Sequence, residues 1–193
     1  MIKRTITDTV DELILHAPVT LITGPRQVGK TTLLTHLLKN KSFHYLSLDD
    51  MTLLMDAKSD PLAFLNAHPH PLIIDEAQKA PELFAYINTL VNKVKVTKGN
   101  EKANAMYILS GSSKQSLIEQ AKESLAGRMM ILNMHSLSLN EIYNRESIPF
   151  STDKAILNKR NNIDINETQI FNYIHRGFLP NLYSDPQIKP YIY

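Results

Sequence analysis

The segment at residues 23–34, TGPRQVGKTTLL, contains the residue types that bind phosphate groups in nucleotide-binding proteins. Gly24, Gly29, Lys30 and Thr31 fit the pattern G-x-x-x-x-G-K-[ST], with an apolar run before it and helical spacing after it. Glycines allow several backbone N–H groups to point into one concavity, and the start of a helix adds partial positive charge. The segment therefore predicts a site for nucleotide phosphates. The alternative is an ordinary glycine-bearing turn between a strand and a helix.

Each residue of this loop has an expected part in binding. Lys30 is expected to reach the β- and γ-phosphates and to assist catalysis, and the hydroxyl of Thr31 is expected to ligate Mg²⁺. No Asn-Lys-x-Asp sequence is present that would pair with guanine, so ATP is the predicted nucleotide. The residues expected to contact it here are Gly24, Pro25, Arg26, Gln27, Val28, Gly29, Lys30, Thr31 and Thr32.

A second pattern, PLIIDEAQ, places two adjacent carboxylates at the end of an apolar run. Asp75, at the carboxyl end of the expected strand, would hold Mg²⁺, and Glu76 would polarise the water that attacks the γ-phosphate. This pair favours hydrolysis over transfer of the phosphoryl group to a small acceptor. The alternative is that the two acids only cap a following helix.

A third pattern, YILSGSS, ends another apolar run in small hydroxyl residues. Ser110 and Ser112 are candidates for sensing the γ-phosphate or the attacking water, because polar groups at this end of a parallel sheet face the ligand. Ser113 is instead expected to be the N-cap of the next helix.

Short aliphatic runs alternate with stretches of helical spacing along the chain, which indicates an α/β fold with a mostly parallel sheet flanked by helices. Polar residues 96–104 and 151–166 are expected to form a loop and a linker. The helix expected over residues 167–177 carries Ile170, Phe171 and Ile174 on one stripe, which is expected to pack on the core as part of a small lid. The five expected strands are 19–23, 43–48, 71–75, 106–110 and 129–134, and the first helices are 30–39 and 81–94.

Composition sets broad limits on partners and compartment. The chain has 193 residues, 43% of them hydrophobic, with a formal net charge of +2 and no cysteine. This charge gives no clear signal for a nucleic-acid or membrane partner, and the absence of cysteine excludes disulfides. Neither a signal peptide nor a membrane-spanning apolar run is recognisable in the sequence, so a cytoplasmic location is expected.

The order of these patterns resembles a family of prokaryotic AAA+-like ATPases, related to archaeal-type and STAND ATPases. The resemblance rests on TGPRQVGKTTLL, LSLDD followed by DPLAFL, PLIIDEAQKAPELF, YILSGSS, SLAGR and LSLNEIY, and more weakly on RGFLP. It implies a P-loop core with strand order 5-1-4-3-2, with ATP and Mg²⁺ as ligands. Ser110 stands where the family more often has threonine, which keeps the hydroxyl.

The resemblance also suggests how the chain is divided. Residues 1–150 are expected to form the ATPase core, and residues 151–193 a linker with a partial helical lid or the start of a further C-terminal region. Because such proteins usually continue into a longer C-terminal domain, this chain is expected to be an N-terminal fragment.

Arg128 in SLAGR is a further candidate for the active site. A guanidinium can neutralise charge on a transferring phosphoryl group, within one subunit or from a neighbouring subunit of a homo-oligomer. The alternative is a surface arginine after a turn glycine.

The function predicted from these residues is Mg²⁺-dependent binding and hydrolysis of ATP, with an unidentified protein client. Two alternatives remain open at this point. One is a conformational switch that binds ATP with little turnover. The other is a small-molecule kinase with a P-loop, which would need an acceptor pocket.

Overall fold

The computed structural model describes residues 2–40, 42–112, 115–148, 151–160, 165–184 and 187–188. Their packing separates two compact units. One is Ile6–His135, and the other combines residues 2–5 with the described residues from Ser136 onward. The expected division of the chain into domains at residue 150 stays a prediction. The expected N-cap Ser113 lies outside the described residues.

The first unit contains a sheet of five strands, and all of its pairs are parallel. The order along the sheet is β2-β3-β4-β1-β5. Read from the β5 edge, this is the predicted order 5-1-4-3-2, so the resemblance gave the correct topology. The strands are β1 (Val19–Gly24), β2 (His44–Ser47), β3 (Leu72–Asp75), β4 (Tyr107–Ser112) and β5 (Met129–Asn133).

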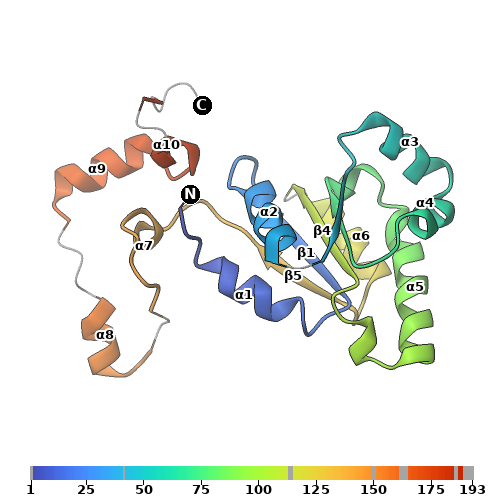
Figure 1. Cartoon of the computed structure of the whole chain (residues 1–193). Coiled ribbons are helices and arrows are strands. Elements are labelled where there is room, and N and C mark those ends of the chain that lie inside the picture. Colours follow the sequence, from blue (N-terminus) through green and yellow to red (C-terminus); the bar gives the residue numbers. More distant parts are fainter. Residues whose placement is uncertain are drawn as a thin grey trace. The chain divides into compact units, whose positions relative to one another are not determined.

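Helices cover both faces of this sheet. Alternate residues of a strand point to opposite faces, and Leu21, Ile74 and Leu109 belong to one core cluster with residues of α3 to α6. Figure 1 shows α1 and α2 on one side of the sheet and α4 and α5 on the other. The helices are α1 (Ile6–Leu13), α2 (Lys30–Asn40), α3 (Met51–Ser59), α4 (Pro61–Ala67), α5 (Leu83–Lys98) and α6 (Gln115–Ser124), with short 3₁₀ turns η1 (Ala77–Lys79) and η2 (Glu101–Ala103).

The loop expected over residues 96–104 is wrong in extent. Helix α5 continues through Lys98, and η2 occupies part of the remaining segment. The polar residues that suggested a loop lie on the last turn of the helix, where Lys95 and Lys98 interact favourably with its C-terminal dipole. Gly99, with φ of 90°, ends the helix.

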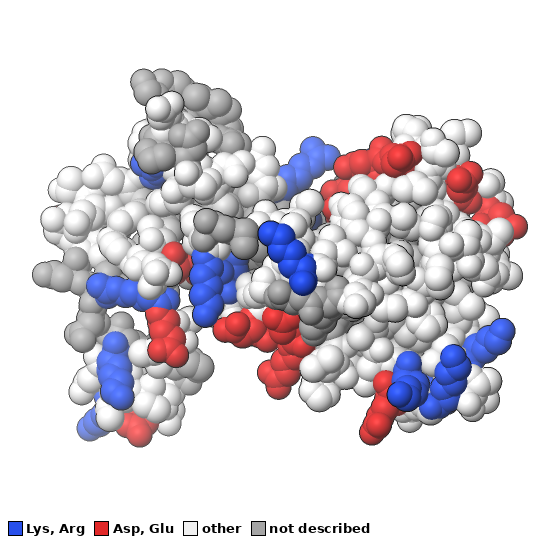
Figure 2. All heavy atoms as spheres, viewed as in Figure 1, with Lys and Arg blue, Asp and Glu red and all other residues white. Residues whose placement is uncertain are grey.

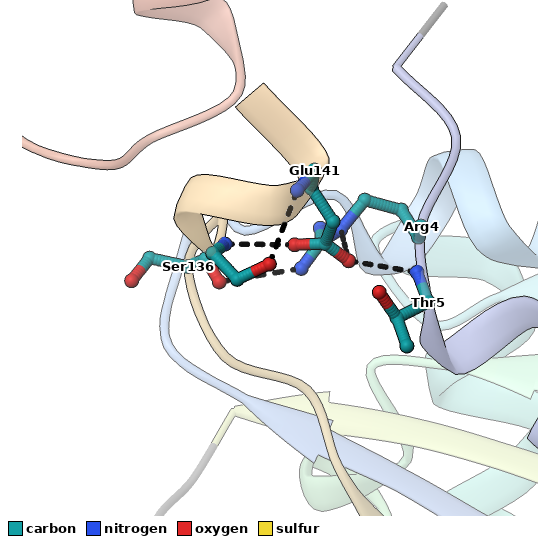
Figure 3. A network of polar contacts seen from close by, with 5 residues as sticks. Arg4, Thr5, Ser136 and Glu141 are labelled. Atoms are coloured by element: carbon teal, nitrogen blue, oxygen red, sulfur yellow. Dashed lines mark hydrogen bonds and ion pairs between the residues drawn. The ribbon is translucent and has the colours of Figure 1, made fainter. Parts of the chain in front are cut away.

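Among its described residues the second unit contains helices α7 to α10, and Glu141 joins several of its segments. One carboxylate oxygen of Glu141 accepts hydrogen bonds from Arg4 Nε at 3.1 Å and Thr5 N at 2.8 Å, and the other accepts from Ser138 N at 2.8 Å (Figure 3). Burial alone would raise the pKa of Glu141, but these donors hold it below its usual value. The ion pair therefore ties residues 2–5 to α7. The helices of this unit are α7 (Leu139–Ile142), α8 (Lys154–Arg160), α9 (Glu167–Arg176) and α10 (Asn181–Ser184).

Two expectations for the second unit need correction, and one is confirmed. The segment 151–166, expected to be a linker, contains α8. Helix α9 ends before Gly177, as predicted. Its apolar stripe is not packed as expected among the residues that the structure describes, since Ile170, Phe171 and Ile174 are 46%, 70% and 65% exposed.

The distribution of charged side chains on the surface agrees with the small net charge of the sequence. On the face shown in Figure 2, Lys and Arg side chains are spread among acidic ones rather than gathered into one basic patch. Within the described part of the chain, every helix is too short or too polar to cross a bilayer.

Candidate functional site

The predicted phosphate-binding loop and the predicted acidic pair lie at the same edge of the sheet. Because all strands are parallel, the carboxyl ends of β1, β3 and β4 lie along one edge. The loop leaves β1 after Gly24, and Asp75 is the last residue of β3. Ligands of open α/β sheets bind at this edge.

The backbone of the loop turns sharply before α2. Gln27 and Gly29 have φ of 65° and 98°, and α2 begins at Lys30. Positive φ is readily adopted by Gly29 but is costly for Gln27, and such strain is concentrated at functional sites. The N–H groups in the first turn of α2 have no acceptor within the helix, so this end of α2 is suited to an anion.

Lys30 is folded onto the loop that it follows. Its Nζ donates hydrogen bonds to the backbone oxygens of Gly24 at 2.9 Å and Pro25 at 2.7 Å, and the residue is only 9% exposed. Burial lowers the pKa of Lys30, whereas the negative charges of Glu76 and Asp75 act in the opposite direction. The ammonium group is thus held by carbonyl oxygens of the loop, and the negative charges of Asp75 and Glu76 act on it.

The other predicted contacts of the loop divide into exposed and buried residues. Val28 is buried and Gly29 is partly buried, so the side chain of Val28 anchors the loop in the core. The exposed members, whose side chains are accessible to a ligand, are Pro25, Arg26, Gln27, Thr31 and Thr32.

Gly24 has a second role that its position in the motif does not reveal. A Cβ atom at Gly24 would lie 2.2 Å from the backbone oxygen of Met134. Met134 N also donates a hydrogen bond to Thr23 O at 2.7 Å. Only glycine therefore fits where the chain after β5 passes the start of the loop.

Asp75 is held from several directions. Its Oδ1 accepts hydrogen bonds from Ser110 Oγ and from Glu76 N at 3.0 Å, and its Oδ2 accepts from the hydroxyl of Tyr45 at 2.9 Å. Burial and the charge of Asp75 raise the pKa of Tyr45 to about 12, so the phenol stays protonated and donates at neutral pH. Ser110 is fully buried and its hydroxyl is directed to Asp75, whereas Ser112 is partly buried at the end of β4.

Glu76 has an unusual backbone. Its φ and ψ are 56° and 37°, a left-handed conformation that costs free energy for a residue with a Cβ. One of its carboxylate oxygens accepts a hydrogen bond from the side-chain amide of Gln78. The turn therefore directs the Glu76 side chain differently from that of Asp75, although the two residues are adjacent.

The residues at this edge suit Mg²⁺ bound together with a phosphate ligand. Among the described residues there is no cluster of three or more His, Cys, Asp or Glu side chains that would hold a metal by itself. Mg²⁺ is usually bound by one or two carboxylates and by the phosphates of its substrate. The hydrogen-bonded carboxylate of Asp75 and the exposed hydroxyl of Thr31 fit that requirement.

Arg128 is not brought together with the other predicted site residues. It directly precedes β5, and its backbone oxygen accepts from Val19 N, so it lies at the amino edge of the sheet. Five residues of β1 separate this edge from Gly24, a distance of about 16 Å. Its side chain donates to Asn92 Oδ1 at 2.7 Å and to Ala126 O at 2.8 Å. Arg128 therefore lies away from the carboxyl edge, and its role in a site, within one subunit or from a neighbouring one, stays a prediction.

Three side chains in these contacts were not anticipated from the sequence: Tyr45, Gln78 and Asn92. Tyr45 and Asp75 lie on the same face of the sheet because Tyr45 pairs with Ile73, two residues before Asp75. The sequence predicted that Tyr45 lies in a strand. The contact with Asp75 could be predicted only if the register between β2 and β3 were also known.

Comparisons with known proteins agree with this arrangement. A family model described as an AAA domain matches residues 16–143. Two uncharacterized proteins, from Mycobacterium bovis and Mycobacterium tuberculosis, are each 35% identical to this chain over 131 residues, which cover 65% of this chain and 27% of theirs. The chain thus matches these curated relatives over about a quarter of their length. A Walker-type ATPase of Pyrococcus abyssi superposes with a TM-score of 0.55 at 14% identity, covering 95% of this chain and 65% of that one.

Proposed function

Because this chain belongs to the AAA-domain family of P-loop ATPases, we propose that it binds ATP with Mg²⁺ and hydrolyses it to ADP and phosphate. The observation that supports this most directly is the position of Lys30. Its ammonium group is held by the loop carbonyls and is influenced by the charges of both Asp75 and Glu76. Two separate segments of the chain, the loop with Lys30 and the end of β3, would thus supply the groups that phosphoryl transfer to water requires.

Binding of the triphosphate falls to the loop and the start of α2. Lys30 would exchange its two carbonyl acceptors for phosphate oxygens, which are stronger acceptors for an ammonium group because they are charged. The exposed residues Arg26, Thr31 and Thr32 lie within the same loop and first helical turn. This part of the site holds the phosphates in one position and neutralises their charge.

Asp75 and Thr31 would hold Mg²⁺, which when bound neutralises charge on the phosphates and fixes their orientation. Glu76 is the proposed general base: its carboxylate would accept a proton from the attacking water. Gln78 keeps one oxygen of Glu76 occupied, so the other oxygen is the one available for that proton.

Ser112, at the end of β4, is the better placed of the two proposed sensors of the γ-phosphate. Ser110 would act through Asp75, since its hydroxyl donates to that carboxylate. An unidentified protein client, assembly into a homo-oligomer and a cytoplasmic location remain parts of this proposal.

The test is release of phosphate from ATP by the purified chain, with and without Mg²⁺ and without any added acceptor. Steady release that requires Mg²⁺ supports the proposed hydrolysis. Tight binding of ATP without release would favour the conformational switch, and ADP production only after addition of a small acceptor would favour the kinase. Absence of nucleotide binding in the folded chain contradicts all three.

A further inference from the structure

Tyr45 contacts the proposed magnesium-binding carboxylate from an edge strand. β2 is the last strand on its side of the sheet, and Tyr45 is 37% exposed there. Tyr45 pairs with Ile73, so its ring points to the same face as Asp75, and its hydroxyl reaches Asp75 Oδ2 at 2.9 Å. The contact links residues 30 positions apart, so it depends on the register of the sheet.

The two oxygens of Asp75 are restrained from opposite sides. Ser110 of β4 donates to Oδ1, and Tyr45 of β2 donates to Oδ2. Rotation of the carboxylate about its last bond would break both contacts, so the pair of hydroxyls fixes the plane of the group. A carboxylate that is fixed before its ligand arrives loses less conformational freedom on binding.

The hydroxyl of Tyr45 is expected to contribute little to the stability of the fold. The residue is partly exposed, and its ring is absent from the main core cluster. Removing the hydroxyl leaves the ring, the strand and the backbone pairing of β2 intact. Besides the side chain of Ser47 on its own strand, the hydroxyl interacts with Asp75 of the neighbouring strand, so its contact between the strands acts on Asp75.

We infer that Tyr45 is a positioning residue, which orients Asp75 for Mg²⁺ bound with the nucleotide. The inference rests on the proposed function. Residues that hydrogen-bond to a metal-binding carboxylate orient it, and their loss typically weakens metal affinity by about 10–100-fold. Tyr45 acts through Asp75 and does not itself touch the nucleotide.

The test compares Tyr45→Phe with the wild-type chain in equilibrium binding of a fluorescent ATP analogue. Affinity is measured in EDTA and then across a Mg²⁺ titration. We expect the Mg²⁺ concentration for half-maximal effect to rise about 10-fold in Tyr45→Phe, with affinity in EDTA unchanged. Tyr86→Phe removes a similarly exposed hydroxyl from α5 and should leave both quantities unchanged.

An unchanged Mg²⁺ requirement in folded Tyr45→Phe would overturn the inference, as would an equal loss of affinity with and without Mg²⁺. Tyr45→Leu provides a second variant without the hydroxyl if Tyr45→Phe fails to fold, and the same selective loss is expected. If the wild-type chain itself binds nucleotide without any effect of Mg²⁺, the proposed function fails, so the two failures are distinguishable.

Discussion

The two edges of the sheet treat their charged side chains differently. At the carboxyl edge, Lys30 donates to carbonyl oxygens of its own loop, Asp75 ends β3, and Glu76 follows it. At the amino edge, Arg128 is bonded to the Asn92 side chain of α5 and to a nearby carbonyl. One edge presents charge next to the loop proposed to bind phosphate, whereas at the other edge Arg128 joins secondary-structure elements.

In this sheet the proposed site lies at the carboxyl edge, whereas the contacts of Arg128 at the amino edge connect elements of the fold. Strand ends and helix N-termini meet at the carboxyl edge, which supplies N–H groups and partial positive charge. Segments at the amino edge instead bond to one another at the surface, as Asn104 does by donating to Leu15 O at 2.9 Å. Substitutions at the two edges should therefore change different measurements.

The largest expected effect is on turnover at the carboxyl edge. Glu76→Gln retains the shape of the side chain but cannot accept the proton of water, so we expect the rate of ATP hydrolysis to fall about 10²–10⁴-fold. Binding of Mg²⁺ and ATP should persist. Phosphate release measures this, and Glu82→Gln, an exposed change before α5, is the control. Hydrolysis by Glu76→Gln at the wild-type rate would show that another group is the base.

Removal of the Lys30 ammonium should act on affinity rather than on folding. Lys30→Ala loses two charge-assisted contacts to phosphate, so we expect ATP affinity to fall about 100-fold. Calorimetric titration of ATP measures the change, with Lys39→Ala near the far end of α2 as the control. Equal affinity in folded Lys30→Ala would place the phosphates elsewhere.

Substitution of one glycine at each edge of the sheet allows the two edges to be compared by the loss in free energy of unfolding. Gly24→Ala places a Cβ 2.2 Å from the Met134 oxygen, and since that oxygen is backbone, we expect a cost of about 3 kcal/mol. Gly127→Ala, beside Arg128 at the amino edge, meets open space and should cost only about 1–2 kcal/mol because φ is 70°. Urea unfolding measures both losses of stability. Equal losses would mean that the backbone near Met134 moves easily to make room for the added Cβ.

The smallest effect is expected for Arg128→Ala. Loss of its bonds to Asn92 and Ala126 should reduce stability by about 1–2 kcal/mol, and ATP affinity should not change. If Arg128 serves a neighbouring subunit, Arg128→Ala should also lose turnover. Mixing it with Glu76→Gln should then restore activity, because some interfaces would combine an intact arginine with an intact glutamate. Mixed oligomers that stay inactive would contradict this role.

Local pattern was sufficient for much of the fold and for part of the site. Lys30 follows a glycine motif, and Asp75 ends an apolar run, so both were identifiable from neighbouring residues. The helix 154–160 was missed because its polar sequence lacks a clear apolar stripe. The polar, glycine-containing residues 96–104 suggested a loop, although a charged residue such as Lys98 is favourable at the C-terminal end of a helix.

Contacts between distant segments could not be predicted in this way. Tyr45 on β2 reaches Asp75 on the neighbouring strand β3, and Arg128 reaches Asn92 of α5. Each depends on register or on the crossing of a helix over the sheet, which composition and periodicity do not specify. The place of Arg128 at the amino edge follows from the expected strand 129–134 directly after it, but its bond to Asn92 does not.

The position of β1 within the sheet has a consequence for synthesis of the chain. Val19 pairs with Tyr107 on one side and with Met129 on the other, so neither partner of β1 exists when the loop after it has been translated. The pair β2 and β3 is complete by Asp75. The N-terminal part emerges from the ribosome first, and pairings between distant segments form late. The nascent chain therefore contains the proposed phosphate-binding loop long before β4 and β5 can pair with β1. Competence to bind nucleotide should thus appear abruptly, once β5 has been made.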